Sequence, residues 1–234
     1  MNTPHSVRLH LYFARSASLA VILRQGPSRA YRMILWNHAD DSFIDGQWLK
    51  SNIYTERCDI SPDGRWFLYF ALDGRQRSSA LWSFTAISRP PWFTALALYP
   101  QGDTWGGGGR FVDAKRYTVD TAVDPGDTLG RAAGTERVFR GTPDTHNTLG
   151  FHHRDGRRVN LRPRDRAFWE GAEEPERPFE TDGGRLYRTA GASRVLVRDF
   201  TDMQFEPIRA PYDWREEPED PPTAWHPLDA EEGQ

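Results

Sequence analysis

The chain has 234 residues, and its composition of 38% hydrophobic, 27% charged and 13% aromatic residues is typical of a protein that buries a sizeable core. Its formal net charge of −3 gives no reason to expect nucleic acid as an obligatory partner, and its single cysteine, Cys58, excludes a disulfide framework. No stretch approaches the ~20 apolar residues of a membrane helix and no signal peptide is evident, so we expect a cytoplasmic protein with no membrane partner.

The first part of the chain alternates between apolar runs and turn residues. Residues 7–14, 19–23 and 31–36 are predicted strands, and the segments between them, 15–18 and 25–28, are predicted turns. Aromatic residues favour strands, and the 20 glycines and 17 prolines supply turns. We therefore expect the chain to open with an antiparallel hairpin and to continue as short strands.

Residues 61–64, with the sequence SPDG, form a turn that has a clear physical mechanism. Proline fixes its own φ, aspartate accepts hydrogen bonds within the turn, and glycine adopts the left-handed conformation. Residues 66–72 follow with the sequence WFLYFAL, which is apolar at every position. A half-exposed strand would be polar at every second position. This strand should therefore be covered on both faces, as in stacked or radially packed sheets.

The SPDG turn and the aromatic strand after it resemble the strand-entry motif of TolB-like and WD-type β-propellers, where such a turn precedes an inner strand of a blade. One good copy is present, residues 155–157 and 182–185 are weak echoes of it, and no fixed-period repeat accompanies them. Three segments also resemble hallmark segments of an uncharacterised bacterial protein family: residues 58–64, 85–91 and 102–109. This resemblance spans about the first half of the chain and implies a bacterial source, but it transfers no catalytic residue.

Four consecutive glycines stand between Trp105 and Arg110, and they are followed by Phe111. Four glycines cannot form the middle of a helix or a good strand, because their backbone entropy opposes it. The segment lacks the Gly-Lys-Ser/Thr ending of a phosphate-binding loop. We interpret it as a mobile surface loop; the alternative is a loop that lets a ligand or a partner backbone approach closely.

Strand signals weaken after residue 112, and residues 213–234 are rich in proline and acidic residues. We expect a single mostly-β domain over residues 1–212 and an acidic, proline-rich C-terminal tail over residues 213–234. A dozen or more short strands without a long helical period predict an all-β fold. Its many short antiparallel strands would form an irregular β-propeller-like or sandwich-like domain.

No catalytic, metal or cofactor motif is found. His146, His152 and His153 lie close in sequence, but neighbouring residues of a strand point to opposite faces, so we predict no metal site. Cys58 stands beside Asp59, which would raise rather than lower the pKa of a thiol. No cofactor is predicted, and whether the protein is an enzyme stays open. The enzyme alternative is a carboxylate-based hydrolase, with three candidate residues at strand ends and turns: Asp59, Asp63 and Asp103.

A second alternative is the binding of a polyanion. If residues 158–166 form a strand, its even positions are arginines except for Asn160 and lie on one face. The odd positions begin with the apolar residues Val159, Leu161 and Pro163, which would face the core. Such a ladder can bind phosphates. The competing interpretation is a solvated face that nearby acidic segments partly neutralise. The residues of this ladder are Arg158, Arg162, Arg164 and Arg166.

The region from residue 88 to residue 111 carries the main hypothesis. It combines tryptophans and arginines, which dominate the hot spots of protein interfaces, with the glycine-rich segment. We expect a non-catalytic module that binds a ligand or, above all, a protein partner. The identity of the partner and the oligomeric state of the protein stay open. The predicted contact residues are Arg89, Trp92, Trp105, Arg110 and Phe111.

Overall fold

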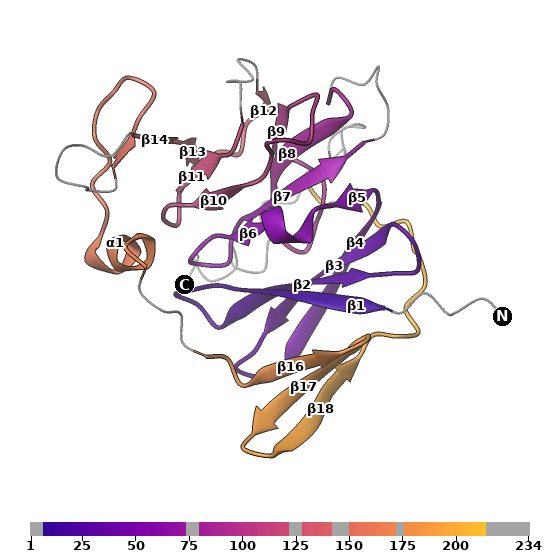
Figure 1. Cartoon of the computed structure of the whole chain (residues 1–234). Coiled ribbons are helices and arrows are strands. Elements are labelled where there is room, and N and C mark those ends of the chain that lie inside the picture. Colours follow the sequence, from indigo (N-terminus) through magenta and orange to yellow (C-terminus); the bar gives the residue numbers. More distant parts are fainter. Residues whose placement is uncertain (1–6, 74–79, 122–127, 142–149, 172–175, 214–234) are drawn as a thin grey trace.

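The structure is a computed structural model, and it describes residues 7–73, 80–121, 128–141, 150–171 and 176–213 (Figure 1). Within these ranges the chain is mostly β, with short strands in five sheets, one short 3₁₀ helix and one short α-helix. The predicted all-β class is confirmed. The described residues form no closed barrel and no closed propeller ring, so the arrangement is one of stacked sheets.

Sheet A is an antiparallel meander in which each strand pairs with the next along the chain. Its strands are β1 (Arg8–Phe13), β2 (Leu19–Gln25), β3 (Ala30–Asn37) and β4 (Ser42–Lys50). The predicted opening strands and their turns therefore match the structure. A β-bulge shifts the register of β3 against β4 near Arg32.

Sheet B contains the aromatic strand after the SPDG turn and has the order β12-β9-β8-β7-β5, with β6 also pairing with β7. The 3₁₀ helix η1 (Thr55–Arg57) lies between β5 and β6. The strands are β5 (Asn52–Ile53), β6 (Asp59–Ile60), β7 (Phe67–Leu72), β8 (Ser83–Ser88), β9 (Ala97–Pro100) and β12 (Leu129–Gly130).

The remaining sheets are smaller. Sheet C pairs β10 (Gly109–Phe111) with β11 (Arg116–Val119) and, in parallel, β11 with β13 (Glu136–Arg137). Sheet D consists of β14 (Phe139–Arg140) and β15 (Phe151–His152). Sheet E consists of β16 (Phe179–Asp182), β17 (Arg185–Ala190) and β18 (Ser193–Asp199), and the helix α1 spans Pro163–Trp169.

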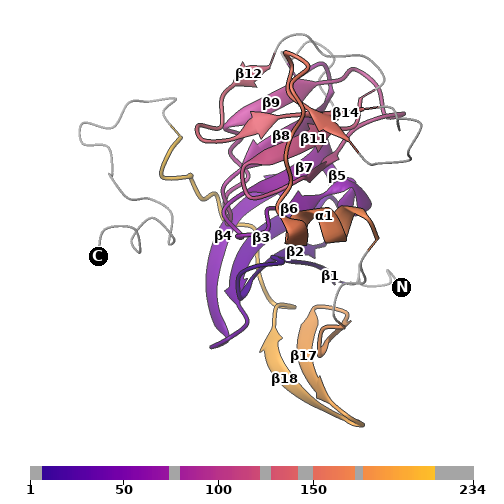
Figure 2. The same ribbon diagram turned by 90° about the vertical axis from the view of Figure 1, so that its left-hand side faces the viewer.

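The sheets stack in the order E, A, B, C, and an apolar core fills each space between neighbours (Figure 1 and Figure 2). Strand β7 contributes to two of these cores. Phe67 and Tyr69 pack against sheet A, whereas Leu68, with Trp66 just before the strand, packs against sheet C. The prediction that both faces of this strand are covered is confirmed, and stacking of sheets is its cause.

The SPDG turn has the predicted geometry. Ser61 Oγ donates to Asp63 Oδ1 at 2.6 Å and accepts from Trp66 N at 3.0 Å, and Gly64 adopts a φ of 79°. The turn also contacts sheet A, since Pro62 O accepts from Ser16 N at 2.7 Å. The motif therefore fixes the entry of β7 and ties it to the turn between β1 and β2.

Three of the four consecutive glycines are buried, so the interpretation as a mobile surface loop is wrong for residues 107–109. A methyl group on Gly107 would overlap the ring of Phe70, and one on Gly109 would overlap the backbone of Thr118. Gly108 donates to Thr85 Oγ1 at 2.8 Å. The glycines are needed because their backbone packs directly onto β7, β8 and β11.

Two other sequence predictions fail or lie outside the described residues. Residues 158–166 do not form a strand, because the second half of this segment is the start of α1. Proline at the first position of α1 fits the helix, where its missing N–H needs no partner. The predicted acidic tail lies outside the described residues except for Asp213, whose amide donates to Ala210 O at 3.0 Å.

Replacing Gly107 with alanine should destabilise the fold much more than replacing Gly134. Both residues have positive φ, 106° and 81°, so both alanines incur the left-handed cost of about 1–2 kcal/mol. Only Gly107→Ala adds an overlap with Phe70, which should cost about 1–3 kcal/mol more. Urea unfolding measures the difference, and equal losses in the two variants would contradict the packing described for residues 107–109.

Candidate functional site

Trp105 is 92% exposed, the largest exposed fraction among the large hydrophobic residues that the structure describes. Most tryptophans of a folded protein are well buried, because the indole removes a large apolar area from water. A fully exposed indole therefore forgoes the favourable free energy of burying its apolar surface as long as the chain is unbound. This feature makes Trp105 the first candidate for a contact residue.

The loop that carries Trp105 is held in place by hydrogen bonds. Asp103 Oδ1 accepts from Trp105 N at 3.0 Å and from Gly106 N at 3.4 Å. Ser83 Oγ donates to Asp103 O at 2.7 Å, and Arg57 Nη1 donates to the carbonyl oxygens of Thr104, at 3.0 Å, and Gly106. Five hydrogen bonds thus fix the backbone of the loop while the indole projects into solvent.

The other predicted contact residues do not join Trp105 in one surface. Phe111 is fully buried in the core between sheets B and C, so its prediction as a contact residue is wrong. Arg89 is half-buried, with Cζ 4.6 Å from the ring centre of Trp66. Trp92 is also half-buried, and its indole N–H has no partner within the described part of the chain. Only Arg110 is exposed like Trp105, and it lines a pocket of its own.

The three carboxylates of the hydrolase alternative are each engaged in a separate turn or strand. Asp63 closes the SPDG turn, Asp103 holds the Trp105 loop, and Asp59 Oδ2 accepts from Phe111 N at 2.7 Å. None of them lines the pocket beside sheet C described below or any of three other pockets of the described residues. The geometry therefore gives no support to a pair of carboxylates that act on a common substrate.

Burial raises the pKa values of two groups that were considered in the sequence analysis, Cys58 and Asp59. It raises the pKa of the Cys58 thiol to about 12, and Tyr54 O accepts a hydrogen bond from that thiol at 3.4 Å. Such a thiol is not a nucleophile at neutral pH. Burial also raises the pKa of Asp59 to about 6, against the opposing effects of the Phe111 N–H and of Arg15.

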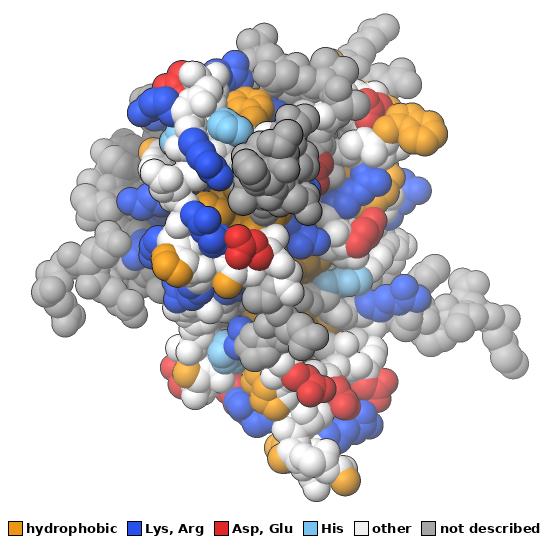
Figure 3. Space-filling model, turned by 60° about the vertical axis from the view of Figure 1, so that its left-hand side comes forward, with side chains coloured by type: hydrophobic (Ala, Val, Ile, Leu, Met, Phe, Trp, Pro, Cys, Tyr) orange, Lys and Arg blue, Asp and Glu red, His pale blue; other side chains and the backbone are white. Residues whose placement is uncertain are grey.

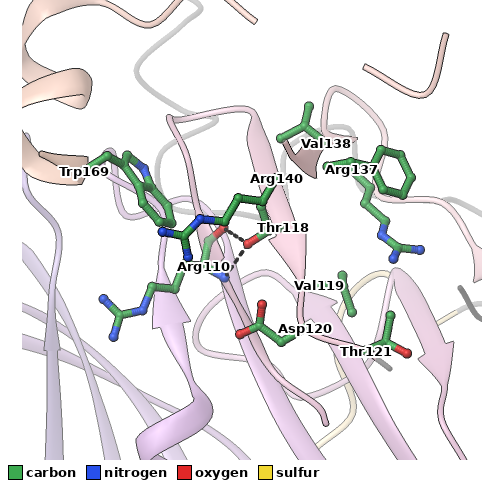
Figure 4. A pocket seen from close by; sticks show the side chains of 10 residues that line it. Arg110, Thr118, Val119, Asp120, Thr121, Arg137, Val138, Arg140 and Trp169 are labelled. Carbon is green, nitrogen blue, oxygen red and sulfur yellow. Dashed lines mark hydrogen bonds between the residues drawn. The ribbon is translucent and has the colours of Figure 1, made fainter. Parts of the chain in front are cut away.

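A pocket of about 530 Å³ opens beside sheet C, between β11, the β13–β14 segment and α1 (Figure 4). Its lining unites segments that are far apart in sequence, and it contains three arginines, one carboxylate and two hydroxyls. On the face of the molecule that carries α1 and β14, arginine side chains lie among apolar ones (Figure 3). The lining residues are Arg110, Thr118, Val119, Asp120, Thr121, Arg137, Val138, Phe139, Arg140 and Trp169.

Sequence reasoning found only Arg110 among these residues. Arg137 and Arg140 follow weak strand signals, and nothing in their spacing relates them to Trp169 some thirty residues later. The arginines that the sequence did single out lie elsewhere. Arg158, Arg162, Arg164 and Arg166 are all exposed, but only Arg164 and Arg166 lie on α1 and the segment is not a strand, so the predicted ladder on one strand face does not form.

The described residues contain no group of three or more His, Cys, Asp or Glu side chains that could hold a metal ion. His153 Nδ1 is 2.6 Å from Glu136 Oε1, whereas His146 lies outside the described residues. No helix in the described ranges is long and apolar enough to cross a membrane.

Comparison with protein-family models, with curated proteins and with solved structures finds no match for this chain. The resemblances to propeller strands and to a bacterial family therefore stay predictions.

The raised pKa of Asp59 predicts a specific dependence of stability on pH. Because the folded pKa of about 6 exceeds the ordinary value of 3.8, the folded state binds more protons than the unfolded state between these values. The contribution of Asp59 to stability is then fully present below pH ~4 and is lost as pH rises to 6, by up to about 1.4 kcal/mol per pH unit.

The variant Asp59→Asn isolates this effect, since its carboxamide oxygen can still accept from Phe111 N. Relative to the unsubstituted protein, the variant should gain stability steadily between pH 4 and pH 6, as measured by urea unfolding. A difference between the two proteins that does not change with pH would show that the Asp59 carboxyl is not buried as a neutral acid.

Proposed function

We propose that this protein is a binding module that inserts Trp105 into an apolar pocket of a partner protein. The observation that supports the proposal is the combination of a 92% exposed indole with a loop backbone fixed by Asp103, Ser83 and Arg57. Tryptophan is strongly enriched among interface hot spots. A loop that is already ordered in the free protein loses less conformational entropy when the partner binds.

The energy available to such a contact is substantial. An indole buries roughly 200 Å² on insertion into a pocket, which corresponds to about 5 kcal/mol of gross hydrophobic stabilisation. Leu81, which is 50% exposed, lies next to the base of the loop, with its Cβ 3.9 Å from the position of a methyl group on Gly102. Leu81 thus adds exposed apolar area near the base of the loop that carries Trp105.

Strain in the backbone beside the loop is consistent with this role. Leu81 and Trp82 have φ values of 51° and 61°, a conformation that bulky residues rarely adopt. Strain of this kind concentrates at binding and catalytic sites, where the surrounding structure holds it. Asp73 N donates to Trp82 O at 2.7 Å and so contributes to holding the segment.

Purification of the tagged protein from its native host tests the proposal. A stoichiometric protein partner should accompany the unsubstituted chain, be lost from Trp105→Ala and be retained by Val195→Ala. Val195, which is 65% exposed on β18, is the control for the removal of exposed apolar surface in general. With the purified partner, Trp105→Ala should weaken affinity by at least about 30-fold. An unchanged set of partners would refute the proposal.

The fixed loop gives a second prediction. Asp103→Ala should remove both hydrogen bonds that Oδ1 accepts and weaken partner binding by about tenfold, because the loop must then be ordered on binding. Asp103→Asn keeps an acceptor oxygen and should restore most of the affinity. Isothermal titration calorimetry should show that the weaker binding of Asp103→Ala arises from a less favourable binding entropy. If Asp103→Ala binds like the unsubstituted protein, the fixed loop plays no part.

A further inference from the structure

The pocket beside sheet C has the size and the wall structure of a small-molecule site. Its volume of about 530 Å³ falls within the range of roughly 300–1,000 Å³ that such sites occupy. Phe139 and Trp169 supply aromatic surfaces in its wall. The ring of Trp169 is held edge-on by Phe151 at 4.8 Å between centres, and Arg137 lies 4.9 Å from the ring centre of Phe139.

The charges in the pocket are unbalanced. The described lining residues include three arginines and one carboxylate, that of Asp120, so these residues together carry an excess of positive charge. Elsewhere in the described part of the chain, several arginines form ion pairs with carboxylates, as Arg188 does with Asp41 and Arg198 does with Asp45. Asp120 forms no ion pair with any arginine of the pocket that the structure describes.

Arg110 and Arg140 are the two groups that this imbalance leaves available. Both are exposed, and the guanidinium of neither makes a hydrogen bond or an ion pair with a described residue. Figure 4 shows both guanidinium groups on the side of the pocket where Trp169 lies, with Arg137 on the opposite side. The hydroxyl of Thr118 contacts the backbone N and O of Arg110, both at 3.4 Å, and so fixes the position from which that side chain extends.

We propose that this pocket binds a small organic anion with about two negative charges attached to a planar apolar group. The anionic end would lie between Arg110 and Arg140, because guanidinium groups bind phosphate and carboxylate through paired hydrogen bonds. The planar group would lie against Trp169, which is on the same side of the pocket as the two guanidinium groups. A phosphate monoester and an aromatic dicarboxylate share this chemistry, and the site is independent of the Trp105 loop.

Titration of the full-length protein with four probes tests the proposal, and the indole N–H resonance of Trp169 serves as the reporter. The resonance is assigned by its absence from Trp169→Phe. Phenyl phosphate or phthalate should bind saturably, with affinity that falls as salt is added. If phenyl phosphate binds and phthalate does not, the ligand class of the pocket is phosphate esters. If phthalate binds and phenyl phosphate does not, the ligand class is dicarboxylates. Inorganic phosphate should bind more weakly than phenyl phosphate, and neutral benzyl alcohol should bind weakly or not at all.

Arg110→Gln and Arg140→Gln should each weaken the preferred probe by at least tenfold, whereas Arg164→Gln should not. Arg164 is an equally exposed arginine on α1 that does not line the pocket, so it controls for the loss of one positive charge. Because neither guanidinium makes a hydrogen bond or an ion pair with a described residue, the midpoint of thermal unfolding should change little in either variant. Trp105→Ala should leave probe binding unchanged, which separates this proposal from that of the partner protein.

Three results would overturn the proposal. The first is no saturable binding of phenyl phosphate or phthalate up to roughly 10 mM. The second is equal affinity in Arg110→Gln, Arg140→Gln and Arg164→Gln, which would place the bound anion elsewhere. The third is binding of benzyl alcohol as strong as that of phenyl phosphate, which would make the pocket an apolar cavity rather than an anion site.

Discussion

The fold depends on burying both faces of its central strands. Alternate residues of β7 pack into different cores, with Phe67 and Tyr69 facing sheet A and Leu68 facing sheet C. A strand without a polar face cannot be stable at a surface, so sheets A, B and C need one another. Sheet E extends this dependence, because it covers the face of sheet A opposite sheet B. The stack is therefore one cooperative unit of successive layers.

Polar contacts fix how the outermost layer sits on this stack. Arg24 on β2 is almost completely buried, and its guanidinium donates to the carbonyl oxygens of Phe200, at 3.0 Å, and Thr201, at 2.9 Å, just after β18. Burial lowers the pKa of Arg24. The three hydrogen bonds of its guanidinium all go to backbone carbonyl oxygens, and no carboxylate takes part in them. The half-exposed pairs Arg188–Asp41 and Arg198–Asp45 add smaller contributions at the edge. A buried guanidinium that binds carbonyls thus gives the apolar contact between sheets A and E a defined register.

Local patterns predicted what depends on local physics. The SPDG turn and the double-sided burial of residues 66–72 follow from side-chain alternation and turn chemistry, and both were predicted. The four glycines were misinterpreted because glycine has the same composition signature in a mobile loop and in a tightly packed backbone. The ladder of residues 158–166 failed because proline at position 163 begins a helix as readily as it ends a strand. The arginine pocket was missed because only the tertiary structure brings β10, the β13–β14 segment and α1 together.

The glycine segment explains why the two candidate sites occur where they do. Its backbone is drawn inward, with Gly107 N donating to Asp120 O and Asp120 N donating to Gly108 O at 2.9 Å. A chain that packs its backbone against Phe70 and Thr118 has no room there for side chains, so the flanking residues must point outward. On one side this leaves Trp105 exposed on its loop, and on the other it leaves Arg110 at the rim of the pocket. The same packing constraint that closes the space between sheets B and C therefore generates both exposed features.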